Sequence, residues 1–431
     1  MKTKIAAFGL ITLLLLSGTV SIACAGDWPM FQHDSRRTGY TEEKVPDSLE
    51  LIWSFSGFGA DPAVAKGKVF IASEDFGSIY CLDANTGDVT WSYEIGERLI
   101  YSPVVTDGKV FFCSFEKGNI YCLDEDNGDL IWSYETGSSV GSSPAEGDGK
   151  FFVSSGDTIY SLDASTGELI WNYKTEGRID SGRTSLAVAE GKVFVAYNDD
   201  KLYCLDANTG KAIWNWKPES RYSNFGAPTV AEGKVIFLEG HLFCLNANTG
   251  NLIWSNQVVL GGSSSPAVAD GKVFVNSAKN KVHCVDVSTG NLIWTYEMGY
   301  GGGGGLGAVL DSSPAVADDK VFVGNATFFG DVGGNSGKLY FSGGSDRIYC
   351  LNMNTGNLVW SYEILDGLYG LAVADGRVFV SSGKGITCFG AKESAPKIPA
   401  GEEETETPGF EMVFTFVGIL AVAYLLRRSR K

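Results

Sequence analysis

The feature that most constrains the fold of this chain is a motif that returns at a nearly constant interval. Its first copy runs from Ile79 to Trp91 and reads Ile-Tyr-Cys-Leu-Asp-Ala-Asn-Thr-Gly-Asp-Val-Thr-Trp. Eight of the ten tryptophans share one phase, separated by 38, 41, 39, 43, 40, 40 and 66 residues. They are Trp53, Trp91, Trp132, Trp171, Trp214, Trp254, Trp294 and Trp360. A period near 40 residues is typical of solenoids and propellers, so this is a repeat protein.

One period contains four short strand patterns, which are clearest in the copy that ends at Trp294. The expected strands cover residues 265–269, 272–276, 282–286 and 292–296. Between the first two, Asp270-Gly271 is a hairpin turn that favours positive φ angles. Consecutive apolar residues such as Val273-Phe274-Val275 favour a strand buried on both faces. A four-stranded meander covered on both faces is a propeller blade, whereas the frequent glycine turns argue against a helical solenoid.

The two ends of the repeated region give the number of blades. Seven complete periods run from Pro62 to Trp360, and an eighth begins at Leu371 and stops after its third strand, residues 386–389. Residues 49–55, at the other end of the region, have the fourth-strand pattern. We therefore predict an all-β, eight-bladed propeller of four-stranded blades. The N-terminal strand completes the last blade, so that no long edge stays unpaired.

The run Asp83-x-x-Thr86-Gly87-x-x-x-Trp91 and its copies resemble the tryptophan-docking motif of propellers of the pyrroloquinoline-quinone (PQQ) type. The short single-domain form is similar to the BamB-type members of that superfamily. The resemblance covers about residues 27–390, including the lead-in that begins Asp27-Trp-Pro-Met-Phe. It implies that the eight tryptophans are structural docking residues. It implies little about function, because the motif packs blades together and catalyses nothing.

Composition suits one large domain and excludes one class of partner. The 431 residues are 44% apolar, which is enough to bury a large core, and a propeller uses such a length as one domain. The chain has 51 acidic and 34 basic residues, and its net charge is −17. Nucleic-acid binding needs clustered basic charge, so no nucleic-acid partner is expected.

The N-terminus carries an export pattern. Residues 1–25 are predicted to be a signal peptide, with an apolar core and a small-residue cleavage site at Ala23-Cys24-Ala25. Lipidation of Cys24 is the alternative, since BamB-type proteins are often lipoproteins, although Ser21 stands where a leucine-like residue is expected. Residues 26–48, called the lead-in below, are expected to lie across the ring, with Trp28 and Phe31 as anchors. The propeller follows over residues 49–390.

The C-terminus carries an anchoring pattern. After an acidic spacer over residues 391–409, residues 410–431 hold an apolar run of 15 residues and then a basic end. This run is shorter than the roughly 20 residues that span a bilayer, but its basic end follows the positive-inside rule. Together with Pro408-Gly409-Phe410, the segment resembles the archaeal PGF-CTERM sorting signal, in which cleavage near Pro-Gly-Phe is followed by lipid attachment. A plain membrane anchor is the alternative, and both place the propeller at the extracellular face of the cell membrane.

Loop placement predicts a binding face. The loops after the second and fourth strands of each blade emerge on one face, called the loop face here. The extra length before Trp360 falls in two such loops, residues 299–311 and 323–348. Candidate binding residues in the loops of this face are Arg98, Tyr101, Arg178, Arg183, Arg221, Tyr222 and Tyr369. Guanidinium groups beside aromatic rings suit carboxylate or peptide recognition, and ordinary solvated loops with local salt bridges are the alternative.

The sequence leads to two hypotheses for the function of the protein. The first is a non-enzymatic, monomeric cell-surface propeller that binds a protein, peptide or glycan through the loop face. The second is a quinoprotein-type oxidoreductase with PQQ in the funnel. Resemblance to quinoprotein dehydrogenases implies an adjacent cysteine pair and a calcium ion, yet this sequence has no adjacent cysteines. The three histidines, His33, His241 and His283, lack ligand spacing, so no metal, cofactor or catalytic residue is predicted.

Two further expectations concern single residues. Seven cysteines share one repeat position and are expected to be buried: Cys81, Cys122, Cys204, Cys244, Cys284, Cys350 and Cys388. Cys113 is additional, and aligning residues 109–115 with 118–124 sets it opposite Cys122. We predict two neighbouring free thiols there, with a strained disulfide as the alternative. Asn325-Ala-Thr327 is the only glycosylation sequon, so Asn325 is a candidate acceptor.

Overall fold

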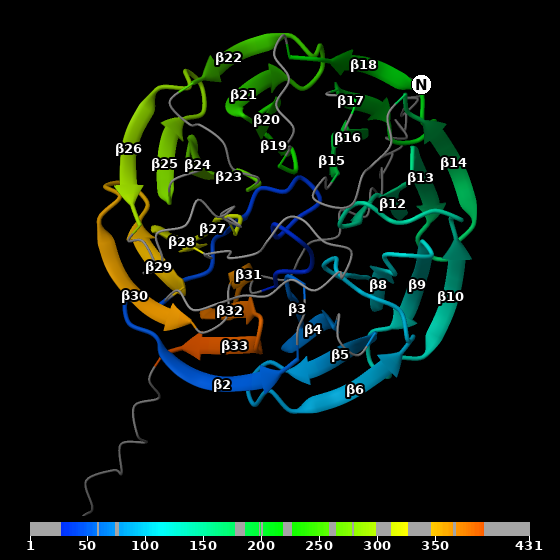
Figure 1. The fold of residues 1–431 in the computed structure, drawn as a ribbon, viewed down its shortest axis with the longest axis horizontal. Coiled ribbons are helices and arrows are strands. Elements are labelled where there is room, and N and C mark those ends of the chain that lie inside the picture. The colour runs from blue at the N-terminus through cyan, green and yellow to red at the C-terminus, as the bar shows by residue number, and fades with distance from the viewer. Residues whose placement is uncertain are drawn as a thin grey trace, which may run out of the picture. The chain divides into compact units, whose positions relative to one another are not determined.

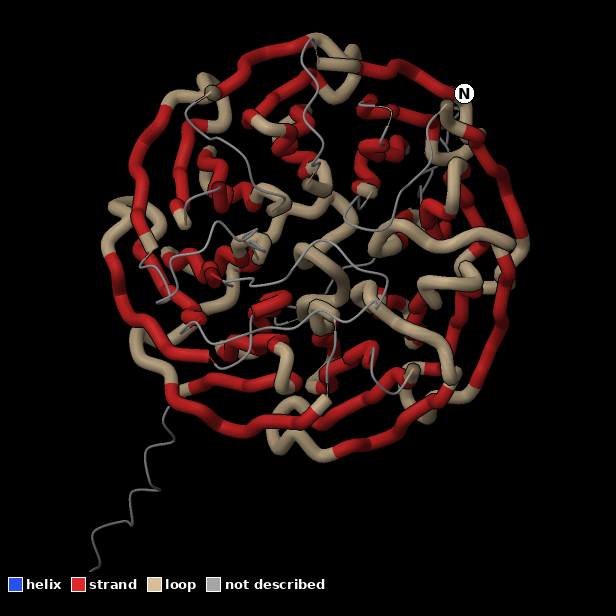
Figure 2. The backbone as a smooth tube through the Cα atoms, in the orientation of Figure 1, coloured by secondary structure: helices blue, strands red, loops and turns tan. Residues whose placement is uncertain are grey.

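The computed structural model describes twelve stretches of the chain between Asp27 and Ala391. They are residues 27–57, 60–73, 77–176, 186–197, 199, 201–218, 226–257, 264–277, 280–298, 312–325, 346–364 and 368–391. Every regular element in these stretches is a β-strand, and the strands form eight radial sheets around one centre (Figures 1 and 2). Over the same stretches, no helix is long and apolar enough to span a bilayer.

The blades are numbered in chain order. Blade 1 contains β3 (Ala63–Ala65), β4 (Lys68–Ser73), β5 (Ser78–Asp83) and β6 (Val89–Glu94). Blade 2 contains β7 (Val104–Thr106), β8 (Lys109–Cys113), β9 (Asn119–Asp124) and β10 (Leu130–Glu135). Blade 3 contains β11 (Ala145–Gly147), β12 (Lys150–Ser155), β13 (Thr158–Asp163) and β14 (Leu169–Lys174). Blade 4 contains β15 (Ala187–Ala189), β16 (Lys192–Tyr197), β17 (Lys201–Asp206) and β18 (Ala212–Trp216).

The second half of the ring repeats this order. Blade 5 contains β19 (Thr229–Ala231), β20 (Lys234–Glu239), β21 (His241–Asn246) and β22 (Leu252–Asn256). Blade 6 contains β23 (Ala267–Ala269), β24 (Lys272–Ser277), β25 (Lys281–Asp286) and β26 (Leu292–Glu297). Blade 7 contains β27 (Ala315–Ala317), β28 (Lys320–Asn325), β29 (Asp346–Asn352) and β30 (Leu358–Ile364), and β1 (Tyr40–Thr41) pairs with β27. Blade 8 contains β31 (Leu368–Ala374), β32 (Arg377–Ser382), β33 (Gly385–Gly390) and β2 (Glu50–Ser56).

The expected architecture is confirmed in detail by blade 6. The turn between β23 and β24 has φ angles of 46° at Asp270 and 69° at Gly271, as a tight hairpin requires. Val273, Phe274 and Val275 are all fully buried, because each second strand is covered by neighbouring blades on both faces. The aromatic and branched side chains of these strands therefore form the core between adjacent blades.

Ring closure by the N-terminal strand is also confirmed. The strand β2 lies antiparallel to β33, with Trp53 opposite Cys388 and Phe55 opposite Ile386. Figure 1 shows the blue β2 beside the orange β33 at the rim, although more than 300 residues separate them in the sequence. The ladder joins the two ends of the repeated region, so blade 8 has four strands like the others.

A tryptophan of one blade is hydrogen bonded to the next blade at seven of the eight junctions. Trp53 Nε1 donates to the carbonyl of Ala84 at 3.0 Å, and a Cβ atom at Gly87 would lie 2.6 Å from the Trp53 ring. Only glycine therefore fits under the indole. The other six acceptors are the carbonyls of Glu125, Ala164, Ala207, Ala247, Val287 and Met353.

The eighth junction lacks this hydrogen bond. Trp360 Nε1 is buried and has no partner among the described residues. The reason is the closure itself: β33 ends at Gly390 and β2 begins at Glu50, so no continuous turn between third and fourth strands faces Trp360. The junction between blades 7 and 8 is thus the seam of the ring.

The seam predicts unequal effects of two equivalent substitutions. Trp254→Phe removes the bond from Nε1 to the Val287 carbonyl (3.1 Å) and is expected to cost about 1 kcal/mol more than Trp360→Phe, which removes an unpaired donor. Urea unfolding of both variants at equal protein concentration measures the difference. Equal losses of stability would show that Trp360 makes a bond equivalent to that of Trp254.

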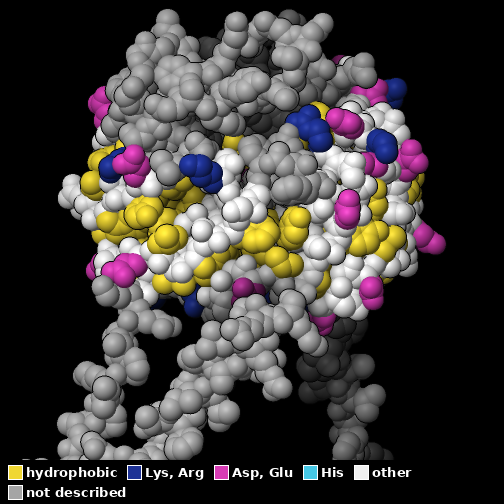
Figure 3. Space-filling view, turned by 60° about the horizontal axis from the view of Figure 1, so that its bottom comes forward, with side chains coloured by type: hydrophobic (Ala, Val, Ile, Leu, Met, Phe, Trp, Pro, Cys, Tyr) yellow, Lys and Arg dark blue, Asp and Glu magenta, His cyan; other side chains and the backbone are white. Residues whose placement is uncertain are grey.

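The outer strands form the rim and carry exposed apolar residues. Each has a register shift at the residue before its tryptophan, as between Leu130 and Trp132 in β10. Leu130 and Ile131 are 47% and 45% exposed, and Figure 3 shows such apolar side chains as a yellow band. Bulges of this kind twist an edge strand and oppose its pairing with another chain.

The structure corrects the register expected around Cys113. Cys113 lies opposite Ile120, and Cys122 lies opposite Phe111, so the predicted Cys113–Cys122 pair is wrong. The hairpin closes one residue earlier than expected, with Ser114 N donating to the Asn119 carbonyl at 2.8 Å. The two cysteines are therefore diagonal neighbours, for which about 7–8 Å is usual. A disulfide needs Cβ atoms about 3.5–4.5 Å apart.

This register predicts eight free thiols in a mature chain that begins at Gly26. All eight cysteines of the described stretches are buried and unbridged, and burial raises the pKa of the Cys122 thiol to about 12. Alkylation under denaturing, non-reducing conditions, followed by mass spectrometry, is expected to find eight labels. Six labels would reveal a bridge that this register does not allow.

Candidate functional site

The lead-in crosses the inner ends of the blades. Trp28, which is 1% exposed, exchanges two main-chain hydrogen bonds of 2.6 and 2.8 Å with Val64 of β3. Five more inner strands donate a central N–H to lead-in carbonyls at 2.6–2.8 Å, from Val105, Val188, Val230, Val268 and Val316. Among the described residues, no blade strand lies on the axial side of these inner strands, and only the short β1 of the lead-in pairs there, with β27, so the lead-in satisfies donors that would otherwise stay unpaired. In Figure 1 it is the blue trace through the centre.

Arg37 fixes the middle of the lead-in, and sequence reasoning missed it. Its side chain is fully buried, and Nε donates to the Leu186 carbonyl at 2.9 Å. Its Nη atoms donate to the carbonyls of Phe31 and Pro144, both at 2.6 Å, and of Ser143 at 3.4 Å. The guanidinium therefore ties blades 3 and 4 to the lead-in. Burial lowers the pKa of Arg37 to about 9, against the opposing charges of Asp34 and Asp61.

Asp61 is the acidic counterpart on the inner side of the ring. It precedes β3, where other blades carry serines such as Ser102 and Ser143, so comparing the repeats would have revealed it. Its carboxylate accepts a hydrogen bond from Ser102 Oγ at 3.2 Å and lies against Gly370, whose hydrogen leaves room for it. Burial raises the pKa of Asp61 to about 7, although Ser102 and Arg37 favour the ionised form.

Two predicted binding residues of the loop face, Arg98 and Tyr101, meet at Phe115. The Arg98 guanidinium lies 5.8 Å from the Phe115 ring centroid, and the Tyr101 ring lies 6.4 Å from it. Arg98 is exposed, whereas Tyr101 is 7% exposed and packs in the core of blades 2 and 3. The exposed Arg98 and the buried Tyr101 therefore both pack against Phe115.

The other candidates are placed less completely. Tyr369 is half-buried in β31, next to the Gly370 that contacts Asp61. Asn325 ends β28, but its side chain lies outside the described residues. Also outside them are Arg178, Arg183, Arg221, Tyr222 and both long loops, apart from the ends of the second. Arg98 and Tyr101 are thus the predicted pair that the structure brings together.

The described residues do not fit PQQ with calcium. They include no group of three or more His, Cys, Asp or Glu side chains that could hold a metal ion. Asp61 is the carboxylate at the inner end of blade 1, and the positive charge of Arg37 lowers its pKa against the effect of burial. Next to it, the donors of Arg37 are bonded to four main-chain carbonyls. These groups therefore pack the lead-in against the inner ends of the blades.

Comparisons with known proteins agree with this architecture. Residues 45–178, 116–240, 155–326 and 326–395 match the family model described as outer membrane protein assembly factor BamB. Residues 407–428 match the PGF-CTERM motif. This motif is a C-terminal surface-anchoring signal, so the protein is exported and anchored at the extracellular face of the membrane. Among curated protein sequences, none matches the chain significantly.

Three solved structures illustrate the fold. BamB from Moraxella catarrhalis has a TM-score of 0.64 and 19% identity, over 81% of this chain and 99% of that one. A europium-containing methanol dehydrogenase has a TM-score of 0.65 and 15% identity, over 83% and 89%. Quinohemoprotein alcohol dehydrogenase from Comamonas testosteroni has a TM-score of 0.65 and 14% identity, over 87% and 82%. At such identities the likeness shows the fold alone.

Proposed function

Since the chain belongs to the BamB family of PQQ-like propellers, we propose that it is a non-enzymatic surface propeller that binds a partner through its loop face. The partner is a protein, peptide or glycan of the cell envelope that presents carboxylate groups. The propeller acts as a monomer held at the membrane by its C-terminal segment. Its role is to hold that partner at the cell surface.

The observation that carries this proposal is the occupied inner side of the ring. Six inner strands donate their central N–H groups to lead-in carbonyls, and the buried Arg37 side chain lies beside the lead-in. A ligand on that side would have to displace these bonds, whereas one on the loop face meets exposed side chains such as Arg98. Arginine beside an aromatic ring is a common carboxylate-binding arrangement, because the planar guanidinium donates two parallel hydrogen bonds.

A quinoprotein oxidoreductase is the second candidate, favoured by the likeness to two dehydrogenases. A direct measurement separates the two functions. The purified protein is incubated with PQQ and Ca²⁺, desalted, and examined for a stoichiometric chromophore. The scaffold proposal expects none, and one bound PQQ per chain would replace it with the oxidoreductase.

The binding face is tested by replacing three arginines together. Arg178→Ala, Arg183→Ala and Arg221→Ala in one chain are expected to leave the unfolding midpoint unchanged, since the sequence predicts these charges in surface loops, where they contribute little to stability. The same variant is expected to lose at least about tenfold in affinity for a partner captured by the wild type, because each lost charged contact is worth about 1.5–3 kcal/mol. Lys109→Ala, Lys150→Ala and Lys272→Ala, at the start of second strands, form the matched control. If the arginine variant captured the partner as well as the wild type does, the partner would bind a different surface of the propeller.

A further inference from the structure

Two positions on the inner side of the ring carry an acid in one blade and an uncharged residue in the seven others. The first position is Asp61 in blade 1, and its counterparts are Ser102, Ser143, Ser185, Ala227, Ser265, Ser313 and Gly370. The second position lies three residues further along each repeat and is Glu146 in blade 3. Its counterparts are all valine: Val64, Val105, Val188, Val230, Val268, Val316 and Val373. The blade fold therefore needs no acid at either position.

The two acids contact the two inner strands that the lead-in does not hold by main-chain hydrogen bonds. Such bonds join the lead-in to six inner strands, but within the described stretches none joins it to β11 or β31. Glu146 is the central residue of β11. Asp61 extends from blade 1 to Gly370 of β31, where only a glycine leaves room for its carboxylate. At these two blades, side chains replace the main-chain contact with the lead-in.

The surroundings of Asp61 favour the neutral form of its carboxyl group. Ser102 Oγ donates to Asp61 Oδ2 at 3.2 Å, and Gly370 brings no charge. The charge of Arg37 favours the ionised form, but this guanidinium donates its hydrogen bonds to four main-chain carbonyls. Burial outweighs both effects and raises the pKa of Asp61 to about 7. Near neutral pH, a large share of the folded chains therefore carries a protonated Asp61.

Glu146 is buried among main-chain and hydroxyl groups. Its side chain stands in place of a valine and is 5% exposed. Its Oε1 accepts a hydrogen bond from Gly149 N at 3.0 Å. Burial raises the pKa of Glu146 to about 6, although this bond and a hydrogen bond with Thr106 favour the ionised form. Glu146 therefore also keeps its proton at a pH where an ordinary carboxyl group is ionised.

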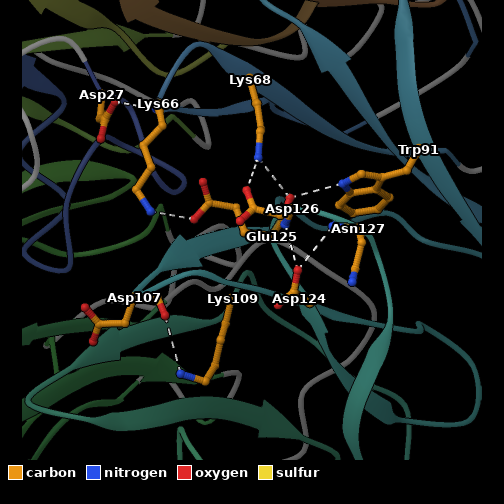
Figure 4. A network of polar contacts seen from close by, with 10 residues as sticks. All are labelled: Asp27, Lys66, Lys68, Trp91, Asp107, Lys109, Asp124, Glu125, Asp126 and Asn127. Carbon is orange, nitrogen blue, oxygen red and sulfur yellow. Dashed lines mark hydrogen bonds and ion pairs between the residues drawn. The ribbon is translucent and has the colours of Figure 1, made fainter.

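Two neighbouring acids add to the effect of burial on Glu146. Asp107, in the turn between β7 and β8, and Asp148, in the turn between β11 and β12, both raise its pKa. Lys109 bonds the main-chain carbonyl of Asp107 at 3.4 Å, while the Asp107 carboxylate points away from it (Figure 4). Lys150 bonds the main-chain carbonyl of Asp148 in the same way, at 3.4 Å. The two lysines therefore leave the negative charges near Glu146 in place.

We propose that Asp61 and Glu146 form a pH-sensitive device: proton binding to these two side chains stabilises the folded ring, and their ionisation destabilises it. In the unfolded chain the two groups have ordinary pKa values of about 3.9 and 4.3. The folded chain keeps both protons to higher pH, so stability is lost as the pH rises from about 4 to about 7, and it stays lost above that range. The ring is therefore closed more firmly on the lead-in in acidic than in alkaline surroundings.

The experiment uses the full chain, purified from membranes, and two substitutions that restore the residue of other blades, Asp61→Ser and Glu146→Val. Urea unfolding at pH 5 and at pH 8 gives the unfolding equilibrium constant of each chain. The ratio of wild type to variant removes the contribution of shared groups such as His33. From pH 5 to pH 8 we expect this ratio to rise about a hundredfold for Asp61→Ser and about tenfold for Glu146→Val. Ratios that stay constant would overturn the proposal.

Two matched variants show whether the effect belongs to these carboxyl groups. Glu168→Gln, at an exposed carboxylate of blade 3, is expected to leave the ratio unchanged between pH 5 and pH 8. Asp107→Asn removes an acid beside Glu146, so it is expected to lower the pKa of Glu146 and to leave that of Asp61 unchanged. A rise of the ratio for Glu168→Gln equal to that for Asp61→Ser would contradict the assignment to the inner acids.

A direct titration gives the same answer if a substitution prevents folding. The carboxyl groups of the ¹³C-labelled wild type are followed by NMR, and Asp61→Asn and Glu146→Gln assign the two signals. We expect the signals to titrate near pH 7 for Asp61 and near pH 6 for Glu146. Signals that titrate near the ordinary values of about 3.9 and 4.3 would contradict the proposal.

Discussion

Removing residues 49–55 is expected to abolish the cooperative unfolding transition of the ring. Without β2, the strand β33 has an open edge, and Trp53 no longer donates to the Ala84 carbonyl. Trp53 also belongs to a core cluster that includes Phe322 of blade 7, Phe379 of blade 8 and Val69 of blade 1. The loss therefore exposes apolar surface at the junctions of three blades. Urea unfolding followed by circular dichroism and by tryptophan fluorescence measures the effect.

A control shows whether closure, rather than any change in β2, is responsible. Leu51 lies in the same strand and is 50% exposed, so Leu51→Ser is expected to shift the midpoint little. A deletion variant that unfolds in one transition at the wild-type midpoint would contradict the closure of the ring by β2. Loss of the transition in both variants would mean that the rim surface, not the ladder with β33, stabilises the ring.

Arg37→Met is expected to destabilise the propeller by about 3–5 kcal/mol, because four carbonyls lose charged donors and buried acceptors become unsatisfied. Methionine fills part of the volume, so the main loss is polar. The predicted change is a lower urea midpoint with an unchanged slope. It would also leave Asp61 without a neighbouring cation and so favour its neutral form.

The adjacent Arg36 is the matched control for this prediction. Its side chain is exposed, while its carbonyl holds Val230 N as the lead-in crosses blade 5. Arg36→Met is therefore expected to change the stability by less than about 0.5 kcal/mol. If Arg37→Met lowered the stability no more than Arg36→Met does, the buried hydrogen bonds of Arg37 would contribute nothing measurable. That result would contradict its role as the centre of the lead-in.

Sequence alone determined the repeat, the four strands of each blade, their number and the closing strand. These features were readable because they depend on local patterns: apolar runs of strand length, turns such as Asp270-Gly271, and a tryptophan at a fixed distance from a glycine. The missing fourth strand of the last blade could be matched to residues 49–55 for the same reason. The sorting signal was readable too, since it is a short contiguous motif.

Only the tertiary structure decided which residues meet across the ring. A one-residue change in where a hairpin closes moved Cys113 from Cys122 to Ile120, and the sequence does not fix that closure. Nothing in the sequence marks Arg37, because its partners are main-chain carbonyls far along the chain, such as those of Leu186 and Pro144. The periodic sequence patterns indicate the strands, turns and docking residues of each single blade. The unpaired Nε1 of Trp360 arises only at the seam, where a ring of repeats must begin and end.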